Sequence, residues 1–113
     1  MATIFTKIIN KEIEADIVYE DKHVLAFNDV APQAPIHILI IPKVEIATVN
    51  NLDLNNASVI KYLFLAAKAI AKNMEFDEDG YRLVMNCNDD GGQSVYHIHL
   101  HLLAGRQLGW PPG

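Results

Sequence analysis

Cysteine is nearly absent from this sequence, and positive charge is in short supply. The one cysteine among 113 residues, Cys87, cannot form a disulfide within the chain, so the sequence does not resemble a disulfide-stabilised secreted domain. Lysine and arginine number 9 against 14 acidic residues, for a net charge of −5. This balance argues against a protein that binds nucleic acid through a broad basic surface. A small nucleotide in a pocket needs only a few donors and remains compatible with it.

Long hydrophobic runs are also missing. The most apolar stretch, residues 62–71, is interrupted by Lys68 and is too short to span a bilayer. The first residues show no basic segment followed by an apolar run, so we expect no signal peptide, no membrane partner and a cytoplasmic location. Half of the residues are hydrophobic. This composition and length predict a single domain, residues 1–113, with one core.

Three of the five histidines lie within a five-residue stretch. His97, His99 and His101 alternate with aliphatic residues, and alternation with period two is typical of a half-buried strand within residues 93–103. On such a strand the three imidazoles point to one face, about 6.5–7 Å apart. On a helix the same spacing would scatter them around the axis.

Two chemistries use such a row of imidazoles. Histidines two apart on a strand can hold zinc with one open position, and an imidazole can act as nucleophile or general acid–base near neutral pH. Residues 89–94, just upstream, suggest an anion cradle, because glycines let N–H groups approach an oxyanion and the Ser94 hydroxyl can donate. No nearby glutamate or second Cys/His pair completes a metal shell. We therefore favour a nucleophile that needs no metal or other cofactor, and keep zinc as the alternative.

The remaining pattern predicts an α+β fold, an antiparallel sheet with one long helix on a face and one or two short helices. Apolar periodicity, turn residues and caps indicate a helix over residues 4–9, strands over 15–20, 24–28, 36–42 and 81–86, and a long helix capped by Asn55 or Asn56 that ends near Asn73. Residues 36–42 are almost continuously apolar, so we expect this strand to be covered on both faces.

Several single residues are candidates for structure or function. His23 lies at the turn of the first hairpin, where we expect an exposed, inert side chain. Asp29, between Phe27 and Val30, is either a turn-former or an acceptor for sugar hydroxyls beside an apolar slot for a base. The long helix is apolar over too wide a stripe for one core-facing side, which favours burial against a second subunit.

The histidine row and its surroundings resemble a known family. His97-Ile98-His99-Leu100-His101-Leu102-Leu103 is similar to the pattern that names the histidine-triad (HIT) superfamily. Residues 91–96, residues 32–37 and the closing Trp110-Pro111-Pro112-Gly113 resemble its Hint branch. The nucleotidyltransferase branch has glutamine in place of the third histidine, so His101 is typical of the hydrolase type.

The resemblance implies a fold and an activity. It implies a five-stranded antiparallel sheet that continues across a homodimer. It also implies a hydrolase that cleaves the P–N bond of purine nucleoside 5′-phosphoramidates through a nucleotidyl-histidine intermediate. A non-catalytic purine-nucleotide-binding scaffold dimer and a zinc-dependent hydrolase built on the same histidines are the competing hypotheses.

The resemblance also implies roles for individual residues. His99 is the expected nucleophile. The residues expected to contact the phosphate or the leaving group, or to support the histidines, are His97, His101, His37, Ser94, Gly92 and Asn86. Asp29 would bind the ribose hydroxyls beside a base slot lined by Phe27 and Val30, and Trp110 would reach the partner subunit's site. Glu45 and Gly109 depart from the histidines that many relatives have there, which leaves the preferred leaving amine open.

Overall fold

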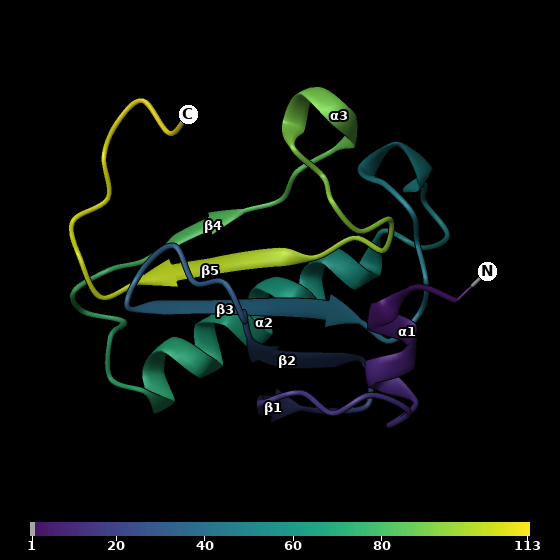
Figure 1. Cartoon of the computed structure of the whole chain (residues 1–113), viewed down its shortest axis with the longest axis horizontal. Coiled ribbons are helices and arrows are strands. Elements are labelled where there is room, and N and C mark those ends of the chain that lie inside the picture. The colour runs from purple at the N-terminus through teal and green to yellow at the C-terminus, as the bar shows by residue number, and fades with distance from the viewer. Residues whose placement is uncertain (1) are drawn as a thin grey trace.

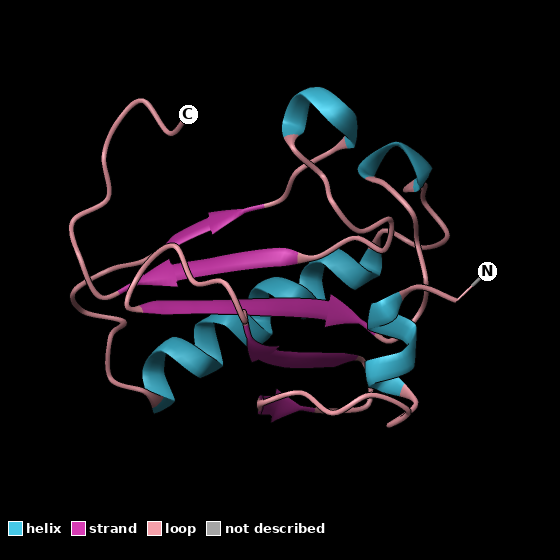
Figure 2. Cartoon of the chain, viewed as in Figure 1, coloured by secondary structure: helices cyan, strands magenta, loops and turns pink. Residues whose placement is uncertain are grey.

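The computed structural model describes residues 2–113 and contains one five-stranded sheet with helices on both faces (Figures 1 and 2). The elements in chain order are α1 (Ile4–Ile9), β1 (Ile17–Glu20), β2 (Val24–Asn28), β3 (Ile36–Pro42), the 3₁₀ helix η1 (Val49–Asn51), α2 (Ser58–Asn73), β4 (Arg82–Val84), α3 (Asn88–Gly91) and β5 (Leu100–Ala104).

The strands lie in the order β1-β2-β3-β5-β4, and every neighbouring pair is antiparallel. β3 is the central strand, and six of its seven residues are buried. The prediction that this apolar run is covered on both faces is therefore confirmed, as is the α+β plan with an antiparallel sheet. β4, in contrast, is a three-residue strand at the edge.

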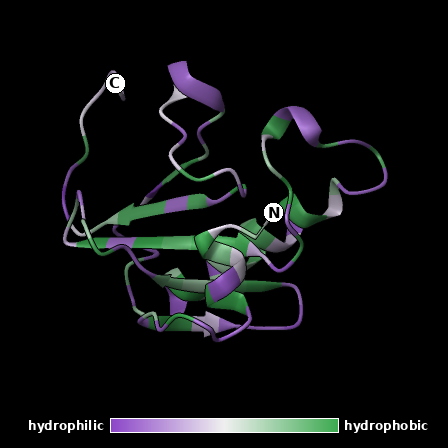
Figure 3. Ribbon diagram, turned by 45° about the vertical axis from the view of Figure 1, so that its right-hand side comes forward, coloured by the Kyte–Doolittle hydropathy of each residue, from purple (hydrophilic) through white to green (hydrophobic). Residues whose placement is uncertain are grey.

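The alternation of side chains along β2 and β3 separates two apolar layers. Val24, Ala26, Ile38 and Ile40 point toward α2, which lies across one face of the sheet (Figure 1). The neighbouring positions form a smaller cluster on the opposite face, under α1; its members are Leu25, Phe27, Leu39 and Ile41 from the sheet and Phe5 and Ile8 from the helix. Figure 3 shows the sheet as mostly hydrophobic ribbon between these layers. The side chains of His37 and His101 lie on the same face as this second cluster.

Helix α1 forms where the sequence predicts it. The Thr3 hydroxyl caps its N-terminus by accepting a hydrogen bond from the Thr6 amide. Phe5 and Ile8, one turn apart, are the buried pair that face the sheet. The helix covers the end of β3 where the chain leaves the sheet (Figure 1).

Helix α2 begins differently from the prediction. Its N-cap is Ala57, which provides no side-chain hydrogen bond, so the expected asparagine cap is wrong. Asn56 instead accepts from the Asp53 amide and donates to the Asn51 carbonyl, and thus shapes the turn before the helix. The apolar stripe is wider than its buried face, because Phe64 and Leu65 remain 47% and 55% exposed. That a second subunit covers Phe64 and Leu65 remains a prediction.

The strand that carries the histidines is shorter than the alternation predicts. β5 begins at Leu100, so His97, which lies in a bend, and His99 both precede it. Residues 97–99 form other hydrogen bonds: the Ile98 amide donates to the Ile46 carbonyl at 2.8 Å, and the His97 carbonyl accepts from the His99 ring. β4 pairs with β5 at three positions only and does not fill residues 81–86.

His23 also differs from its expected exposure. Its ring stacks on Tyr62 of α2, with centroids 3.7 Å apart and planes 2° from parallel, and the residue is half-buried. Over residues 2–113, none of the helices has both the length and the apolar character required to cross a membrane.

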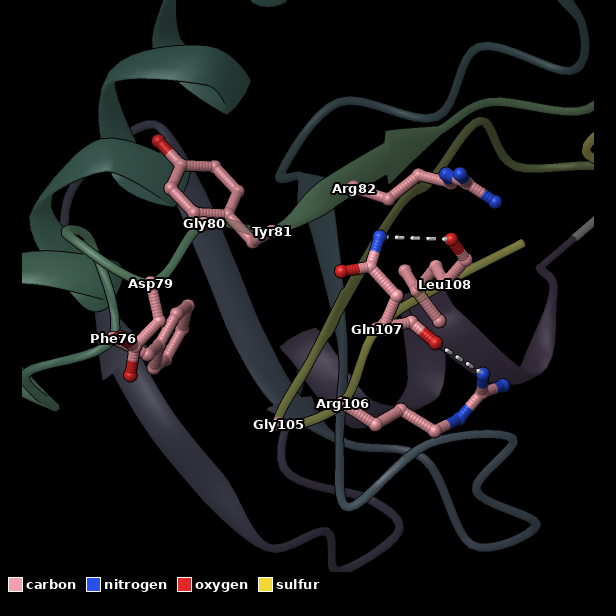
Figure 4. Close-up of a pocket in the computed structure, with 9 residues that line it drawn as sticks. All are labelled: Phe76, Asp79, Gly80, Tyr81, Arg82, Gly105, Arg106, Gln107 and Leu108. Carbon is pink, nitrogen blue, oxygen red and sulfur yellow. Dashed lines mark hydrogen bonds between the residues drawn. The ribbon is translucent and has the colours of Figure 1, made fainter. Parts of the chain in front are cut away.

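A cavity of about 430 Å³ lies at the far end of β4 and β5 (Figure 4). Tyr81, Arg82 and the segment from Gly105 to Leu108 line it. Two side-chain hydrogen bonds join its lining residues to one another, from Arg106 Nη1 to the Gln107 carbonyl and from Gln107 Nε2 to the Leu108 carbonyl, and Arg106 Nη2 also donates to the Gln33 carbonyl. None of its lining residues is a histidine, so size alone does not locate the chemistry of this protein.

Candidate active site

The sheet register brings two distant histidines to the same face. His101 of β5 pairs with Leu39 of β3, and His37 pairs with Leu103. Side chains of paired residues share a face, and so do residues two apart in one strand. His37 and His101 are therefore diagonal neighbours on the α1 face, with ring centroids 5.2 Å apart.

The other two rings of the row lie next to them, under α1. The rings of His99 and His101 are 4.9 Å apart. Phe5 meets both His99 and His97 edge-on, at 5.0 and 5.9 Å between centroids. Four of the chain's five histidines thus form one cluster. The alternation predicts three of them on one face, although β5 itself includes only His101.

The proton positions on His99 follow from its one recorded partner. Its Nδ1 lies 2.9 Å from the His97 carbonyl oxygen, which only accepts, so Nδ1 carries a proton. A neutral ring then keeps its lone pair on Nε2. His99 is 5% exposed and belongs to the site face of the sheet, so this lone pair is held in a fixed orientation.

His97 is anchored through both ring nitrogens. Its Nε2 donates to the Pro42 carbonyl at 2.8 Å, which leaves the lone pair on Nδ1, 3.4 Å from the Thr3 hydroxyl. Its side chain is fully buried. His97 therefore has no nitrogen left for a ligand, and its contribution is to hold the carbonyl that orients His99.

A chain of three hydrogen-bonding groups sets the tautomer of His101. The Gln33 amide donates to His37 Nδ1 at 3.0 Å, so the His37 proton is on Nε2. That proton faces His101 Nδ1 at 2.9 Å, and Asp29 Oδ2 is a second acceptor at the longer distance of 3.4 Å. We assign the proton to the shorter contact, so the remaining proton of His101 lies on Nε2.

The Nε2 atom of His101 differs from the other buried histidine nitrogens of residues 2–113, because it lacks a hydrogen-bond partner. It is buried and has no hydrogen-bond partner among residues 2–113. Buried donors are rarely left unpaired in a native protein, because an unmade bond costs about 1–3 kcal/mol. A donor N–H held beside the His99 lone pair suits an anionic group of a substrate.

Burial keeps the three rings of the row neutral. Desolvation is the largest cause in each case and lowers the pKa of His97, His99 and His101 below the ordinary histidine value of 6.5. For His101 the neighbouring His99 and His37 add to the effect, and the pKa falls to about 4. At neutral pH His99 is therefore a neutral imidazole, the form whose lone pair can attack.

The glycine segment is a short helix, α3, followed by Gly92 in a left-handed conformation (φ 81°). Gln93, which the sequence analysis did not single out, fixes this turn. Its buried side chain accepts from the Asn88 amide and donates to the carbonyls of Ala47 and Val95. Its partners are backbone groups, one of them 46 residues away, so no local pattern marks it.

Ser94 and Asn86, predicted phosphate contacts, lie at the edges of this turn. Ser94 is exposed, and Asn86 is half-buried. A Cβ added to Gly91 would lie 3.7 Å from the Asn86 backbone, so the end of β4 and the glycine turn touch.

The residues predicted to contact a nucleoside differ in burial and in hydrogen bonding. Asp29 Oδ1 accepts from the Ala31 amide at 2.8 Å, as a turn-former does, and its other oxygen faces His37. Both hypotheses about Asp29 therefore fit the structure. Phe27 is buried against Phe5, whereas Val30 is fully exposed. Trp110 is 82% exposed; the Arg82 guanidinium lies 6.0 Å from its ring and donates to the Gly109 carbonyl.

One group of residues has the spacing of a metal site. Donor atoms of Asp29, His37 and His101 all lie within 4.8 Å of one another. While His37 Nδ1 accepts from the Gln33 amide, however, its Nε2 carries a proton and has no lone pair to give. The arranged donors do not fit a resident metal ion.

Comparison of the chain with known proteins identifies its family. The HIT domain profile matches residues 10–108 of the chain. The chain belongs to the HIT domain family. The Escherichia coli (strain K12) protein named purine nucleoside phosphoramidase is 54% identical over 107 residues, which are 95% of this chain and 90% of that protein. A Zea mays protein named 14 kDa zinc-binding protein is 55% identical over 113 residues, 98% of this chain and 88% of that protein.

A solved structure agrees with the fold in detail. The crystal structure of a HIT family hydrolase from Legionella pneumophila Philadelphia 1 has a TM-score of 0.96 and 52% identity, and covers 99% of this chain and 100% of that chain. The predicted family, fold and enzymatic character are thereby confirmed.

The lowered histidine pKa values predict that acid destabilises this HIT domain. Between about pH 6.5 and pH 4 the unfolded chain binds protons that the folded histidines do not, so the free energy of unfolding rises with pH in this window. Urea denaturation at a series of pH values should show that the free energy of unfolding falls as the pH drops below about 6.5. The variant His101→Asn should have a shallower slope. An equal slope in both proteins would contradict the assignment of His101.

Proposed function

We propose that this chain hydrolyses the P–N bond of purine nucleoside 5′-phosphoramidates through a nucleotidyl-histidine intermediate. The observation that carries the proposal is the hydrogen bond from His99 Nδ1 to the His97 carbonyl, which leaves the Nε2 lone pair of a neutral imidazole free for attack. The name of the Escherichia coli relative supports the class of substrate.

In the first step, His99 Nε2 attacks the α-phosphorus. A bond forms between this nitrogen and phosphorus while the bond to the leaving amine breaks. The amine nitrogen takes up a proton as it leaves, from Ser94 or from a neighbouring imidazole such as His101. The product of the step is a nucleotide attached to His99 and a free amine.

Charge on the phosphoryl oxygens needs donors that are already in place. The unpartnered Nε2–H of His101 is one such donor, and the Gly92 amide, the Ser94 hydroxyl and the Asn86 side chain are the others that we propose. Gln93 holds the turn that carries Gly92 and Ser94 by three hydrogen bonds. Donors fixed in this way cost little reorganisation when charge develops.

In the second step, water attacks the phosphorus and displaces His99. The bond from phosphorus to imidazole breaks, the ring regains its neutral form, and the nucleoside monophosphate is released. Over the two steps, one water is consumed and one amine and one monophosphate are formed. The proton that water loses goes to the group that gave its proton to the amine in the first step, Ser94 or His101, and so restores that group.

The nucleoside would lie beside Asp29 and Phe27. We propose that the Asp29 carboxylate accepts from the ribose hydroxyls, since one of its oxygens already faces the cluster through His37. Phe27 and Val30 would line the base slot. Val30 is fully exposed in the free chain, so a base at this position would cover it.

We also propose a homodimer. β4 is an edge strand with unpaired backbone groups on one side, and α2 exposes Phe64 and Leu65. Edge strands and apolar patches of this kind favour association. Trp110, which is exposed at the end of the chain, would then reach the partner subunit's site.

The first test concerns His99. His99→Ala should reduce turnover of adenosine 5′-monophosphoramidate by several orders of magnitude, because the variant lacks the nucleophile. Rapid acid quench of the wild type should trap a protein heavier by one nucleotide, attached to His99. His97→Ala should lose less activity, since His97 has no nitrogen available to the substrate.

Dialysis against a chelator separates this mechanism from the zinc-dependent alternative. The wild type should keep its activity after exhaustive dialysis, whereas a zinc enzyme should lose it and regain it with zinc. Failure to turn over any member of a panel of nucleoside phosphoramidates, with nucleotide binding intact, would instead favour the non-catalytic scaffold.

The second test concerns Asp29. Asp29→Asn keeps an oxygen that can accept from the Ala31 amide but removes the negative charge. Affinity for nucleoside monophosphates should fall by about 1.5–3 kcal/mol, the usual value of a charge-assisted hydrogen bond. Turnover of a phosphoramidate without ribose should change little. Unaltered nucleotide affinity would remove Asp29 from the site.

The third test concerns assembly. Sedimentation at micromolar concentration should give a dimer for the wild type and a shift toward monomer for Leu65→Asp, which places charge on the exposed face of α2. A folded wild-type monomer at that concentration would refute the dimer.

The fourth test concerns the C-terminal tail. Removal of Trp110 to Gly113 should leave folding intact and change the preference among leaving amines.

A further inference from the structure

Glu45 is an exposed carboxylate between β3 and η1, and no step of the proposed reaction uses it. The Thr6 hydroxyl of α1 donates to Glu45 Oε1 at 2.7 Å. This hydrogen bond, together with one from the Thr3 amide, holds the pKa of the Glu45 carboxyl below its ordinary range. Glu45 is therefore an anion that is hydrogen-bonded to the first turn of α1. Negative charge is favoured at this end of a helix by the helix dipole.

Glu45 also holds Thr3, whose amide hydrogen-bonds to the same carboxylate. Thr3 Oγ1 accepts from the Thr6 amide and lies 3.4 Å from both the Thr6 hydroxyl and His97 Nδ1. The Thr6 proton is used on Glu45, so in its contact with Thr3 the Thr6 hydroxyl can only accept. The Thr3 proton therefore has two acceptors within reach, the Thr6 oxygen and His97 Nδ1. Only the second is a buried lone pair for which Thr3 is the donor at hand.

His97 needs that proton. Its Nε2 donates to the Pro42 carbonyl, so its Nδ1 is a buried lone pair, and Thr3 is the partner recorded for it. Without a donor this atom would be an unsatisfied polar group in a fully buried side chain. The ring could then change its tautomer or rotate away from Pro42.

The carbonyl of His97 is the acceptor for His99 Nδ1. A change in the position of the His97 ring therefore shifts the carbonyl that orients the His99 ring, and only one peptide unit separates the two residues. Phe5 of the same helix lies against both rings, at 5.0 Å from His99 and 5.9 Å from His97. The start of α1 thus contacts the nucleophile by packing and through a hydrogen-bonded chain.

We infer that Thr3 and Glu45 are positioning residues for His99. Glu45 fastens the first turn of α1 through Thr6, and the Thr3 hydroxyl of that turn holds His97 in the setting that aims the His99 lone pair. The inference rests on the proposed function in that His99 is the nucleophile, and it assigns neither residue a contact with the substrate.

The inference predicts a separation of kcat from KM. Thr3→Val removes the hydroxyl and keeps the shape, and kcat should fall on the order of 10- to 100-fold, because attack is sensitive to displacements of about 1 Å. KM should change by less than about threefold, because the proposed nucleotide contacts are on other elements. Thr3→Ser, which keeps the hydroxyl, should stay near the wild type.

Glu45 offers the same kind of comparison. Glu45→Ala should lower kcat in the same direction and less than Thr3→Val, and Glu45→Gln, which can still accept from Thr6, should recover most of the loss. Glu12→Ala is the matched control. Glu12 is an exposed carboxylate near the other end of α1 with one long hydrogen bond, from Asn10 at 3.5 Å, and its variant should match the wild type.

The ring nitrogens of His97 provide a measurement that needs no turnover. Nitrogen-15 NMR of the wild type should show Nε2 protonated and Nδ1 unprotonated. Thr3→Val should give a mixture of the two tautomers, and Thr3→Ser should give the wild-type pattern. Glu45→Ala, an exposed substitution outside the core, should show an intermediate pattern and serves as the folded variant if Thr3→Val does not fold.

Two results would overturn the inference: an unchanged His97 pattern in both Thr3→Val and Glu45→Ala, or a loss of activity that appears in KM with kcat unaltered. Absence of phosphoramidate turnover by the wild type would refute the proposed function instead. In that case the NMR comparison would still decide whether Thr3 and Glu45 set His97.

Discussion

The hydrogen bond from His99 Nδ1 to the His97 carbonyl is the constraint on which the site depends. It fixes one tautomer of His99 and so leaves the remaining lone pair on Nε2. The backbone groups just before β5, which begins at Leu100, also have partners outside the sheet: the Ile98 amide donates to the Ile46 carbonyl, and the His97 carbonyl accepts from the His99 ring.

The three imidazoles of the row, His97, His99 and His101, can lie so close together only when they are neutral. Two charged rings 4.9 Å apart, such as His99 and His101, would repel each other in a site that burial has already made costly for charge. Burial by Phe5 and the sheet removes that difficulty by lowering the pKa values. The same arrangement ties the protonation state of these rings to stability, because the protons that weaken the fold at acid pH are those that bind to them.

Sequence patterns were sufficient where the determining contacts are local. The continuous apolar run predicts β3 with its bounds, the 3.6-residue period predicts α1, and alternation places the histidines on one face. Patterns failed where a residue acts on backbone groups far away. Gln93 closes the glycine turn against the Ala47 carbonyl, 46 residues away, and this contact has no period. The Gln33 amide sets the tautomer of His37 from four residues away, a local contact that also leaves no periodic pattern. The α2 cap failed for a related reason, since the side chain of Asn56 satisfies the preceding turn instead.

The two chemistries that the histidine row suggested can be weighed by counting lone pairs. A neutral imidazole has one, and a zinc ion needs several, whereas a nucleophile needs one. In the cluster, the lone pairs of His37, His97 and His101 each face a hydrogen-bond donor, from the Gln33 amide, the Thr3 hydroxyl and the His37 ring respectively. The lone pair on Nε2 of His99 is the one without such a donor. Binding zinc would require at least two of these hydrogen bonds to break and their donors to be left buried, while attack on phosphorus requires no rearrangement. The hydrogen-bond network therefore favours covalent catalysis by His99 over a metal site made from the same side chains.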